Sequence, residues 1–251
     1  MDPIITAAVT SFATTIATNG TKAPLETLDN LWYLAFGKLN HFVEKKKAQH
    51  QHSLEEYKNS IAEKIISIDD NNLQEPPMSV VGPALEASKY YIEEENLREM
   101  FANIVAASMD KSKSSNVHHA FVEMIKQLSP EDARNMMLFK QNEFYPVVRF
   151  VRSLLQYDSH IILNTNVFHG YESDIIVGNE NAASITNLSR LGLVSISYDS
   201  SFNQKERYDI YKNSTYFKNL QSLNNDEVKY DLKEGYIALS PLGKSFISVC
   251  L

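Results

Sequence analysis

The chain of 251 residues contains a single cysteine, Cys250, and few glycines. With one cysteine no internal disulfide can form, which fits a reducing compartment, and we expect a cytoplasmic protein. The eight glycines are scattered, and neither G-x-x-x-x-G-K-[ST] nor G-x-G-x-x-G occurs, so the common phosphate-binding loops are excluded. H-E-x-x-H, C-x-x-C and G-x-S-x-G are also absent. The sequence therefore contains no catalytic motif of these kinds and implies no cofactor.

Positive charge is also in short supply. Lysine and arginine number 24 against 31 aspartates and glutamates, which gives a formal net charge of −7. Such a protein has no overall attraction to nucleic-acid phosphates or anionic membranes, so any nucleic-acid contact would have to be local. The hydrophobic content of 43% is enough to bury a sizeable core in one large domain or two small ones.

No charged residue lies between Asp2 and Lys22. A secretion signal would carry basic residues before its apolar run, and six threonines make the segment too polar to span a bilayer. Four apolar residues instead recur at helical spacing: Ile5, Val9, Phe12 and Ile16. We therefore expect an amphipathic helix that packs on the body or on a partner subunit, with contact to a membrane interface as the alternative.

The next segments have the rhythm of buried helices. An apolar stripe is formed by Leu28, Leu31, Trp32, Ala35, Leu39, Phe42 and Val43. We expect Trp32 and Phe36, one turn apart, to be core residues, and residues 45–47, all lysine, to close this helix at its C-terminal end. Ser53 and Glu56 are spaced as a capping box that would start a further helix.

The stretch "DDNNLQEPPMSVVGP", residues 69–83, combines polar residues with Pro-Pro and Gly-Pro pairs and predicts an internal boundary. Helical patterns resume beyond it, and Ser129 and Pro130 predict the start of another helix. The segments 145–155 and 160–168 are rich in β-branched and aromatic residues, which is compatible with strands or with a short buried helix. A helix from Ala182 to Leu191 is expected to stop at Gly192.

Strands are then expected at residues 193–198 and 235–239, followed by a final helix capped by Ser240. This order of helix, two strands and helix is similar to a winged-helix module. We therefore predict a mainly α fold with a smaller α+β part. Its three segments would be N-terminal helices at 1–75, forming a helical bundle with a central helical block at 76–142, and a winged-helix-like C-terminal module at 143–251.

Winged-helix modules often read DNA, but the recognition helix would offer only Arg190, Asn187 and, just ahead of it, Asn181 to base edges. Residues 182–251 carry eight basic and seven acidic side chains, a net charge of +1. That balance gives little affinity for phosphates. The sequence therefore favours a structural or protein-binding role for this module over DNA binding.

Several residues are candidate ligands or nucleophiles, and a structural interpretation is favoured for each. His119 and Glu123 lie four apart on one helix face, but their neighbours are apolar and no third ligand is evident. The histidines His41, His50 and His52 lack nearby cysteine or carboxylate ligands arranged around them. Residues 93–95, all glutamate, are explained by the dipole of a following helix. Cys250 lies in an apolar helix tail and reads as a small buried hydrophobe.

Three phrases carry a resemblance to a known family: "LWYLAFGKLNHF", "ALEASKYYIEEENLREMFANIVAASMDKSKSSNVHHAFVEMIKQLSPEDA", and the ending from "NLSRLGLVSI" to "GYIALSPLGKSFISVCL". In order and spacing they resemble the Abi-alpha (abortive infection alpha) family of bacterial proteins. The resemblance implies a role in defence against bacteriophage and no established reaction. It therefore assigns no catalytic, cofactor-binding or metal-binding residue.

Two classes of function follow. The first is a soluble sensor or interaction protein whose partner is a phage or host protein. The alternative is a toxin-like effector, acting as a cryptic metal-dependent nuclease or nucleotidase, or on the membrane. A homo-oligomer and a local nucleic-acid contact stay open, and a membrane partner is not expected.

Overall fold

The structure is a computed structural model, and it describes residues 11–12, 23–37, 44–157, 159–171 and 180–251. This part of the chain contains ten α-helices and a four-stranded antiparallel sheet. It divides into two compact units, Met1–Pro130 with Ser245–Leu251, and Glu131–Lys244. The division into three segments at residues 75 and 142 stays a prediction.

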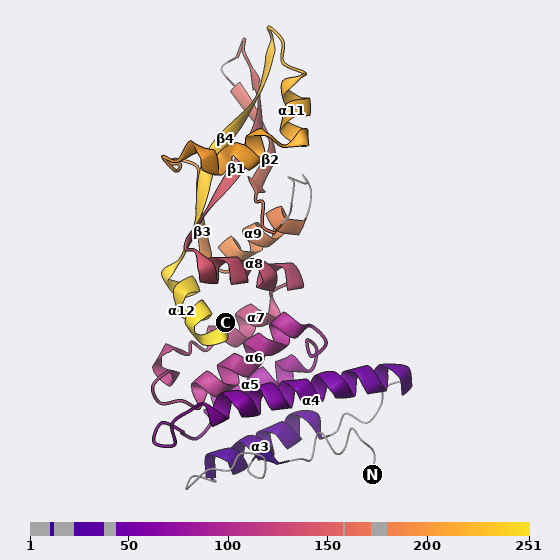
Figure 1. The fold of residues 1–251 in the computed structure, drawn as a ribbon, viewed down its shortest axis with the longest axis vertical. Coiled ribbons are helices and arrows are strands. Elements are labelled where there is room, and N and C mark those ends of the chain that lie inside the picture. Colours follow the sequence, from indigo (N-terminus) through magenta and orange to yellow (C-terminus); the bar gives the residue numbers. More distant parts are fainter. Residues whose placement is uncertain (1–10, 13–22, 38–43, 158, 172–179) are drawn as a thin grey trace. The chain divides into compact units, whose positions relative to one another are not determined.

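The first unit is helical (Figure 1). Its helices are α3 (Ala23–Phe36), α4 (Glu44–Ile66), α5 (Met78–Ser88), α6 (Glu95–Ser108) and α7 (Ala120–Lys126), with a 3₁₀ turn η1 (Ser114–Asn116) before α7. Helix α6 forms the centre, because ten of its side chains are buried and it packs against α4, α5 and α7. Among the described helices, none combines the length and apolar content that a bilayer-spanning segment requires.

An aromatic cluster holds α3 and α4 together. The Trp32 ring lies 4.4 Å from Phe36, 5.5 Å from Phe12 and 5.6 Å from Tyr57, measured between ring centroids. The expected core positions of Trp32 and Phe36 are therefore confirmed. Of the predicted N-terminal helix, Phe12 is buried against this cluster, while Ile5, Val9 and Ile16 lie outside the described residues.

Two local expectations in this unit are wrong, and a third is correct only in part. Residues 45–47 do not close a helix, because α3 ends at Phe36 and α4 begins at Glu44. Ser53 does not cap a helix, since it is buried in the interior of α4. The stretch 69–83 does interrupt the helices, because α4 ends at Ile66 and α5 begins at Met78, but Gly82 and Pro83 lie inside α5 and not in the break. At Ser53 and Pro83, packing of buried apolar neighbours outweighs a local signal worth about 1 kcal/mol for a cap and about 3 kcal/mol for a proline inside a helix.

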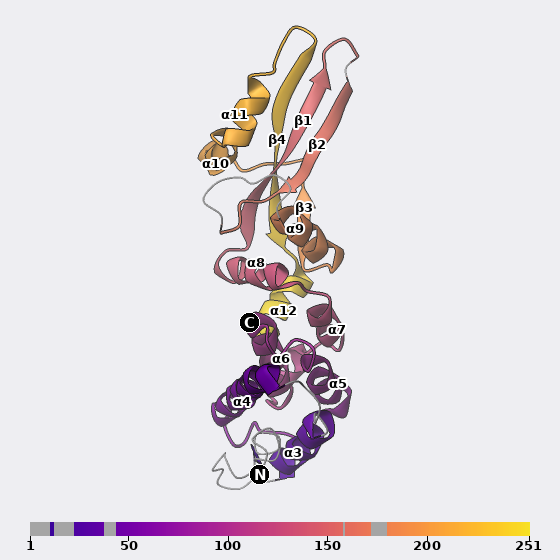
Figure 2. The same ribbon diagram turned by 90° about the vertical axis from the view of Figure 1, so that its right-hand side faces the viewer.

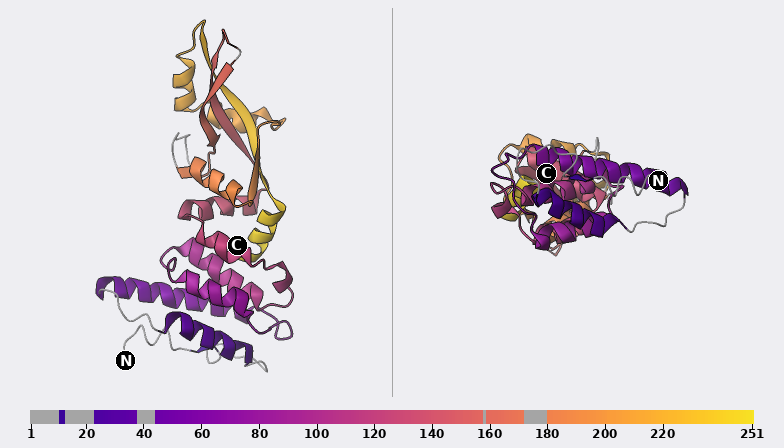
Figure 3. Two further views of the ribbon diagram at one scale, coloured as in Figure 1. Left: turned by 180° about the vertical axis from the view of Figure 1, so that it is seen from behind. Right: turned by 90° about the horizontal axis from the view of Figure 1, so that it is seen from below.

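The second unit combines helices with the sheet. It contains α8 (Pro130–Gln141), β1 (Phe144–Leu154), β2 (Ser159–Val167), α9 (Glu180–Arg190), β3 (Val194–Ser197), η2 (Lys205–Tyr208), α10 (Asp209–Lys212), α11 (Thr215–Gln221) and β4 (Val228–Leu239). The strand order is β2-β1-β4-β3, and the strands can be followed from opposite sides in Figures 1 and 3. The two segments left open between strand and helix are thus strands β1 and β2. Helix α12 (Pro241–Cys250) ends the described chain.

The predicted order of helix, two strands and helix is present as α9, β3, β4 and α12, but the winged-helix assignment itself is not confirmed. Strand β4 is much longer than expected and pairs along its whole length with β1. Gly192 ends α9 with a φ of 74°, a left-handed conformation that glycine adopts without strain. The Gly243 N–H donates to Ser240 Oγ at 2.8 Å, which confirms the expected cap of α12.

The segment between β3 and β4 covers one face of the sheet. In Figure 2 its helices α10 and α11 lie next to β4, and β2 lies on the opposite side of the sheet, where it forms an edge. Tyr211 of α10 and Phe217 of α11 join Tyr208 of η2 in a hydrophobic cluster with Val148, Phe150 and Val167 of the sheet. This packing leaves the outer part of the β1–β2 hairpin more exposed than the base of the sheet.

Candidate interaction surface

His119 and Glu123 do not form a joint site. His119 occupies the N-cap position of α7, and its Nε2 lies 3.0 Å from Ser79 Oγ. Glu123 instead forms an ion pair with Lys126 one turn on, at 2.9 Å. Among the described residues, no group of three or more His, Cys, Asp or Glu side chains is arranged to hold a metal ion. That the protein binds no metal stays a prediction, to be measured directly.

Two of the other candidate histidines, His50 and His52, lie near carboxylates. His50 Nδ1 lies 3.7 Å from Glu93 Oε1, and His52 Nε2 lies 3.3 Å from Glu56 Oε1. Glu56 also pairs with the buried Arg98, whose other guanidinium nitrogen donates to the Ile92 carbonyl. These contacts tie α4 to the start of α6. His41 lies outside the described residues.

Cys250 is buried, and burial raises the pKa of its thiol well above the ordinary value. Its backbone carbonyl accepts a hydrogen bond from Asn103 on α6 at 2.9 Å. A thiol that is both buried and protonated is a poor nucleophile. Its position therefore favours the structural role expected from the sequence.

The polar residues of α9 that were candidates for base contacts form hydrogen bonds within the protein, although Arg190 itself is exposed. Asn187 donates to Asp132 on α8 at 2.8 Å, and Arg190 donates to Asn187 Oδ1 at 2.7 Å. Buried Asn181 accepts a hydrogen bond from Asn135 at 3.1 Å. The side chains that could have read DNA bases are therefore engaged within the protein.

This network joins two phrases of the sequence, "SPEDA" and "NLSRLGL", which lie 55 positions apart at Asp132 and Asn187. Asn135 also donates to Ser184 at 3.0 Å, so the contact between α8 and α9 is polar and buried. Buried polar groups that bond each other fix one packing arrangement. The sequence analysis did not predict this pairing. Asp and Asn residues inside the two helices could have indicated it, because such residues are unfavourable in a helix interior unless their side chains form hydrogen bonds.

Two hollows in the described surface contain no catalytic arrangement. The first, about 230 Å³, lies in the helical unit and is lined in part by Lys64, Asn103, Asp110 and Lys113. Lys64 is paired with Glu99 at 2.8 Å, so this lysine is engaged outside the hollow. The second, about 450 Å³, lies beside α9 and is lined by Thr165, Ala182, Ala183, Thr186, Asn187 and Arg190. Neither lining brings a nucleophile together with a base.

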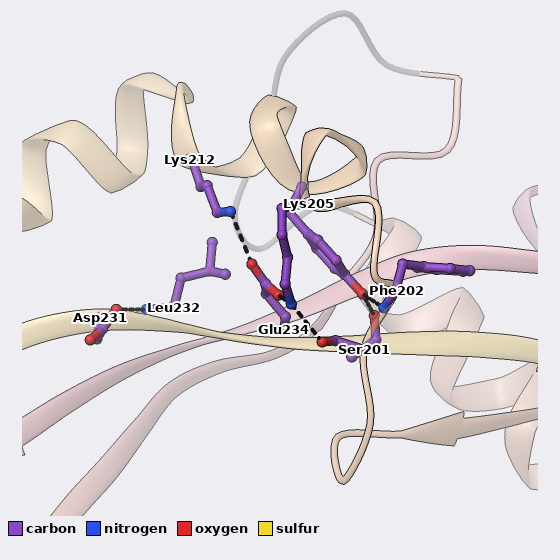
Figure 4. Close-up of polar contacts among 9 residues, drawn as sticks. Ser201, Phe202, Lys205, Lys212, Asp231, Leu232 and Glu234 are labelled. Atoms are coloured by element: carbon purple, nitrogen blue, oxygen red, sulfur yellow. Dashed lines mark hydrogen bonds and ion pairs between the residues drawn. The ribbon is translucent and has the colours of Figure 1, made fainter.

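A three-residue ion cluster fixes the segment between β3 and β4 to the sheet (Figure 4). Glu234 on β4 accepts hydrogen bonds from Lys205 at 2.5 Å and from Lys212 at 2.9 Å. Burial alone would raise the pKa of Glu234, but the two lysines outweigh it and the pKa lies below its ordinary value. Tyr208, between the lysines in sequence, donates to the Gly235 carbonyl at 2.8 Å. The cluster is therefore an anchor for η2 and α10.

More than half of the exposed large apolar side chains described in this unit lie on the outer part of the β1–β2 hairpin. Five large apolar residues there have exposed fractions between 37% and 73%: Leu155, Tyr157, Ile161, Ile162 and Leu163. We call these five residues the hairpin surface. Three of them are consecutive on β2, which is an edge strand of the sheet (Figure 2). Successive side chains of a strand point to opposite faces, so Ile161 and Ile162 flank this edge from its two sides. Exposed apolar groups along an unpaired strand edge favour contact with another molecule.

The profile of the abortive infection alpha family matches residues 49–250. The chain belongs to the abortive infection alpha family. The match contains the Asp132–Asn187 network, the Glu234 cluster and the hairpin surface, whereas Phe12 and Trp32 precede it. Membership in the family suggests a role in abortive infection. No curated protein and no solved structure gives a significant match to the chain.

Proposed function

We propose that this protein is an anti-phage defence protein of the abortive-infection type that acts by binding another protein through the hairpin surface. Family membership supports the defence role. The hairpin surface is the observation that carries the mode of action, because it contains five of the fourteen exposed large apolar side chains in the described part of the chain.

The energetics support contact over solvent exposure. Burial of apolar surface contributes about 25 cal/mol per Å², and a fully buried Leu or Ile contributes roughly 1.5 to 3 kcal/mol. Leu155, Tyr157 and Ile161 are each more than half exposed, so most of this free energy is available to a partner. Around them, Arg152 and Lys229 provide a polar rim of the kind found at protein interfaces.

The way in which the candidate polar residues are bonded supports an interaction function over a catalytic one. Asp132, Asn187 and Glu234 are engaged in hydrogen bonds that hold elements together. A hydrolytic centre would instead need polar groups that converge on a space for substrate. The proposal is therefore a sensor or adaptor of infection, without its own chemistry.

Phage challenge of cells that express single variants tests the proposal. Ile162→Lys places a charge on the hairpin surface, and Ile210→Lys makes the same change at an exposed isoleucine of α10. Protection should fall at least tenfold in plating efficiency for Ile162→Lys and stay near wild type for Ile210→Lys. Both proteins should retain their melting temperatures to within about 2 °C, because surface changes usually alter stability by less than 0.5 kcal/mol.

Two results would contradict the proposal. Full protection by Ile162→Lys would show that the hairpin surface is not used. Loss of protection together with leakage of liposomes by the wild-type protein, and no leakage with Ile162→Lys, would assign the surface to a membrane instead of a protein. Release of products from nucleic acids or nucleotides with divalent metal would support the nuclease or nucleotidase alternative.

A further inference from the structure

We infer that the hairpin surface binds a second copy of this chain, and that the two copies join by antiparallel pairing of their β2 strands. The inference rests on the proposed use of this surface for protein contact and names the partner. It is carried by the edge position of β2, by its composition and by the register of its ladder with β1.

Strand β2 offers an open edge for pairing. It is hydrogen-bonded to β1 on one side, and on the other side no described strand pairs with it. Backbone N–H and C=O groups on such an edge form a template for another strand. Natural edge strands are commonly protected by charge or proline, yet residues 159–167 contain no Asp, Glu, Lys, Arg or Pro. The register irregularity at Leu163 interrupts the edge, so the regular part before it, which carries exposed Ile161 and Ile162, is the part open to a second strand.

The register defines where a second strand can pair. Ser159 to Ile162 lie opposite Leu154 to Val151 in an unbroken antiparallel ladder, and the register shifts beyond that point, at Leu163. A two-fold axis at Ile161 uses this regular part. It places Ile161 opposite Ile161 of the second copy and His160 opposite Ile162 of the second copy. Directly opposed apolar side chains of this kind stabilise antiparallel pairs.

Composition favours a second copy over an unrelated strand. In a symmetric antiparallel pair, the two strands have the same sequence and run in opposite directions. A charged residue near the two-fold axis would then lie close to the same charge on the other copy, which is destabilising. The uncharged sequence Ser159–Val167 carries no such penalty. The other edge of the sheet is β3, which has only four residues and a different sequence. Pairing of β2 with β2 is therefore isologous and closes as a dimer, and it does not propagate into a fibre.

The expected dimer is weak. A stable interface typically buries about 800 Å² on each partner, and five partly exposed side chains with a short strand provide less than that. We therefore expect association in about the micromolar range, so that the dimer forms as protein concentration increases.

Sedimentation and cysteine cross-linking of the full chain test the inference. The wild-type protein should shift from monomer to dimer as its concentration increases, and Ile161→Lys should stay monomeric at every concentration. Under mild oxidation, Ile161→Cys should cross-link to its own copy at least tenfold faster than His160→Cys, because only residue 161 faces itself. Opposed residues in a sheet lie about 4.5 to 5.5 Å apart between Cα atoms, which a disulfide can span. Buried Cys250 serves as the internal background.

The results separate this inference from the proposed function. The inference that the partner is a second copy would be overturned by a wild-type protein that is monomeric at all concentrations and shows no preference for cross-linking at residue 161. If Ile161→Lys loses protection in that case, the hairpin surface binds a different protein. A dimer that Ile161→Lys disrupts without loss of protection would support the inference and contradict the proposed function. A faster cross-link in His160→Cys than in Ile161→Cys would overturn the register. Ile161 is 51% exposed, so Ile161→Cys should fold and the cross-linking result should hold even if Ile161→Lys has a lower melting temperature.

Discussion

Replacement of Trp32 by alanine should remove the centre of the aromatic cluster in the helical unit. The indole is 1% exposed and contacts the rings of Phe12, Phe36 and Tyr57 at centroid distances of 5.5, 4.4 and 5.6 Å. Truncation of a buried tryptophan costs about 3 to 5 kcal/mol, out of the roughly 5 to 15 kcal/mol that stabilise a typical domain. At about 2 to 4 °C per kcal/mol, the melting temperature should fall by roughly 6 to 20 °C.

Circular dichroism is the appropriate measurement, because Trp32 is the single tryptophan and its replacement removes the fluorescence signal. Tyr33→Ala is the matched control on the same helix, since Tyr33 is 57% exposed and its loss should change stability by less than about 0.5 kcal/mol. In the wild-type background, Phe12→Ala should shift the emission of Trp32 to longer wavelength, because water reaches the indole. A Trp32→Ala protein that melts within 2 °C of wild type would refute the core assignment.

Three further predictions concern charged groups. Burial lowers the pKa of Lys58 from 10.5 to about 8, so between pH 8 and pH 10.5 the unfolded chain binds more protons than the folded one. The stability of the protein should therefore increase as pH rises through this window. In a series of thermal melts, Lys58→Met should show a smaller increase. Glu234→Gln should cost about 1.5 to 3 kcal/mol in urea unfolding at pH 7. Because the pKa of Glu234 is lowered, this contribution should be lost as pH falls below 4.5, and the unfolding free energies of the variant and the wild type should then converge. Asp132→Ala should destabilise the protein by about 1 to 3 kcal/mol, because Asn187 loses its carboxylate partner; an unchanged urea midpoint would show that the buried network is dispensable.

Local chemistry made part of the fold predictable. Gly192 at the end of α9, Ser240 at the start of α12 and Pro130 at the start of α8 all act through their own backbone and nearest turn. Such signals depend on a few neighbouring residues and can be read from sequence. They failed at Ser53, because its side chain is buried in α4 and a distant packing face decides the conformation there.

The candidate site depended on contacts that the sequence does not encode locally. The apolar composition of β2 is visible in the sequence, but its edge position follows from β1 pairing with β4, whose residues lie more than seventy positions later in the chain. Asp132 and Asn187 likewise meet across 55 positions. A pattern of residues predicts which elements form, whereas exposure of one strand depends on which partners the other strands take.

In the sequence, the helical unit is made of residues that precede the sheet-containing unit and of residues that follow it. Phe246 packs edge-on against Phe121 at 5.3 Å, and Asn103 binds the carbonyl of Cys250. The helical unit is therefore completed by residues 245–251, which the ribosome makes after all the strands. The helical unit therefore lacks its last residues until translation has passed β4. A stop codon introduced before residue 245 would leave Phe121 without its aromatic partner, and the truncated product would be a substrate for cellular proteases.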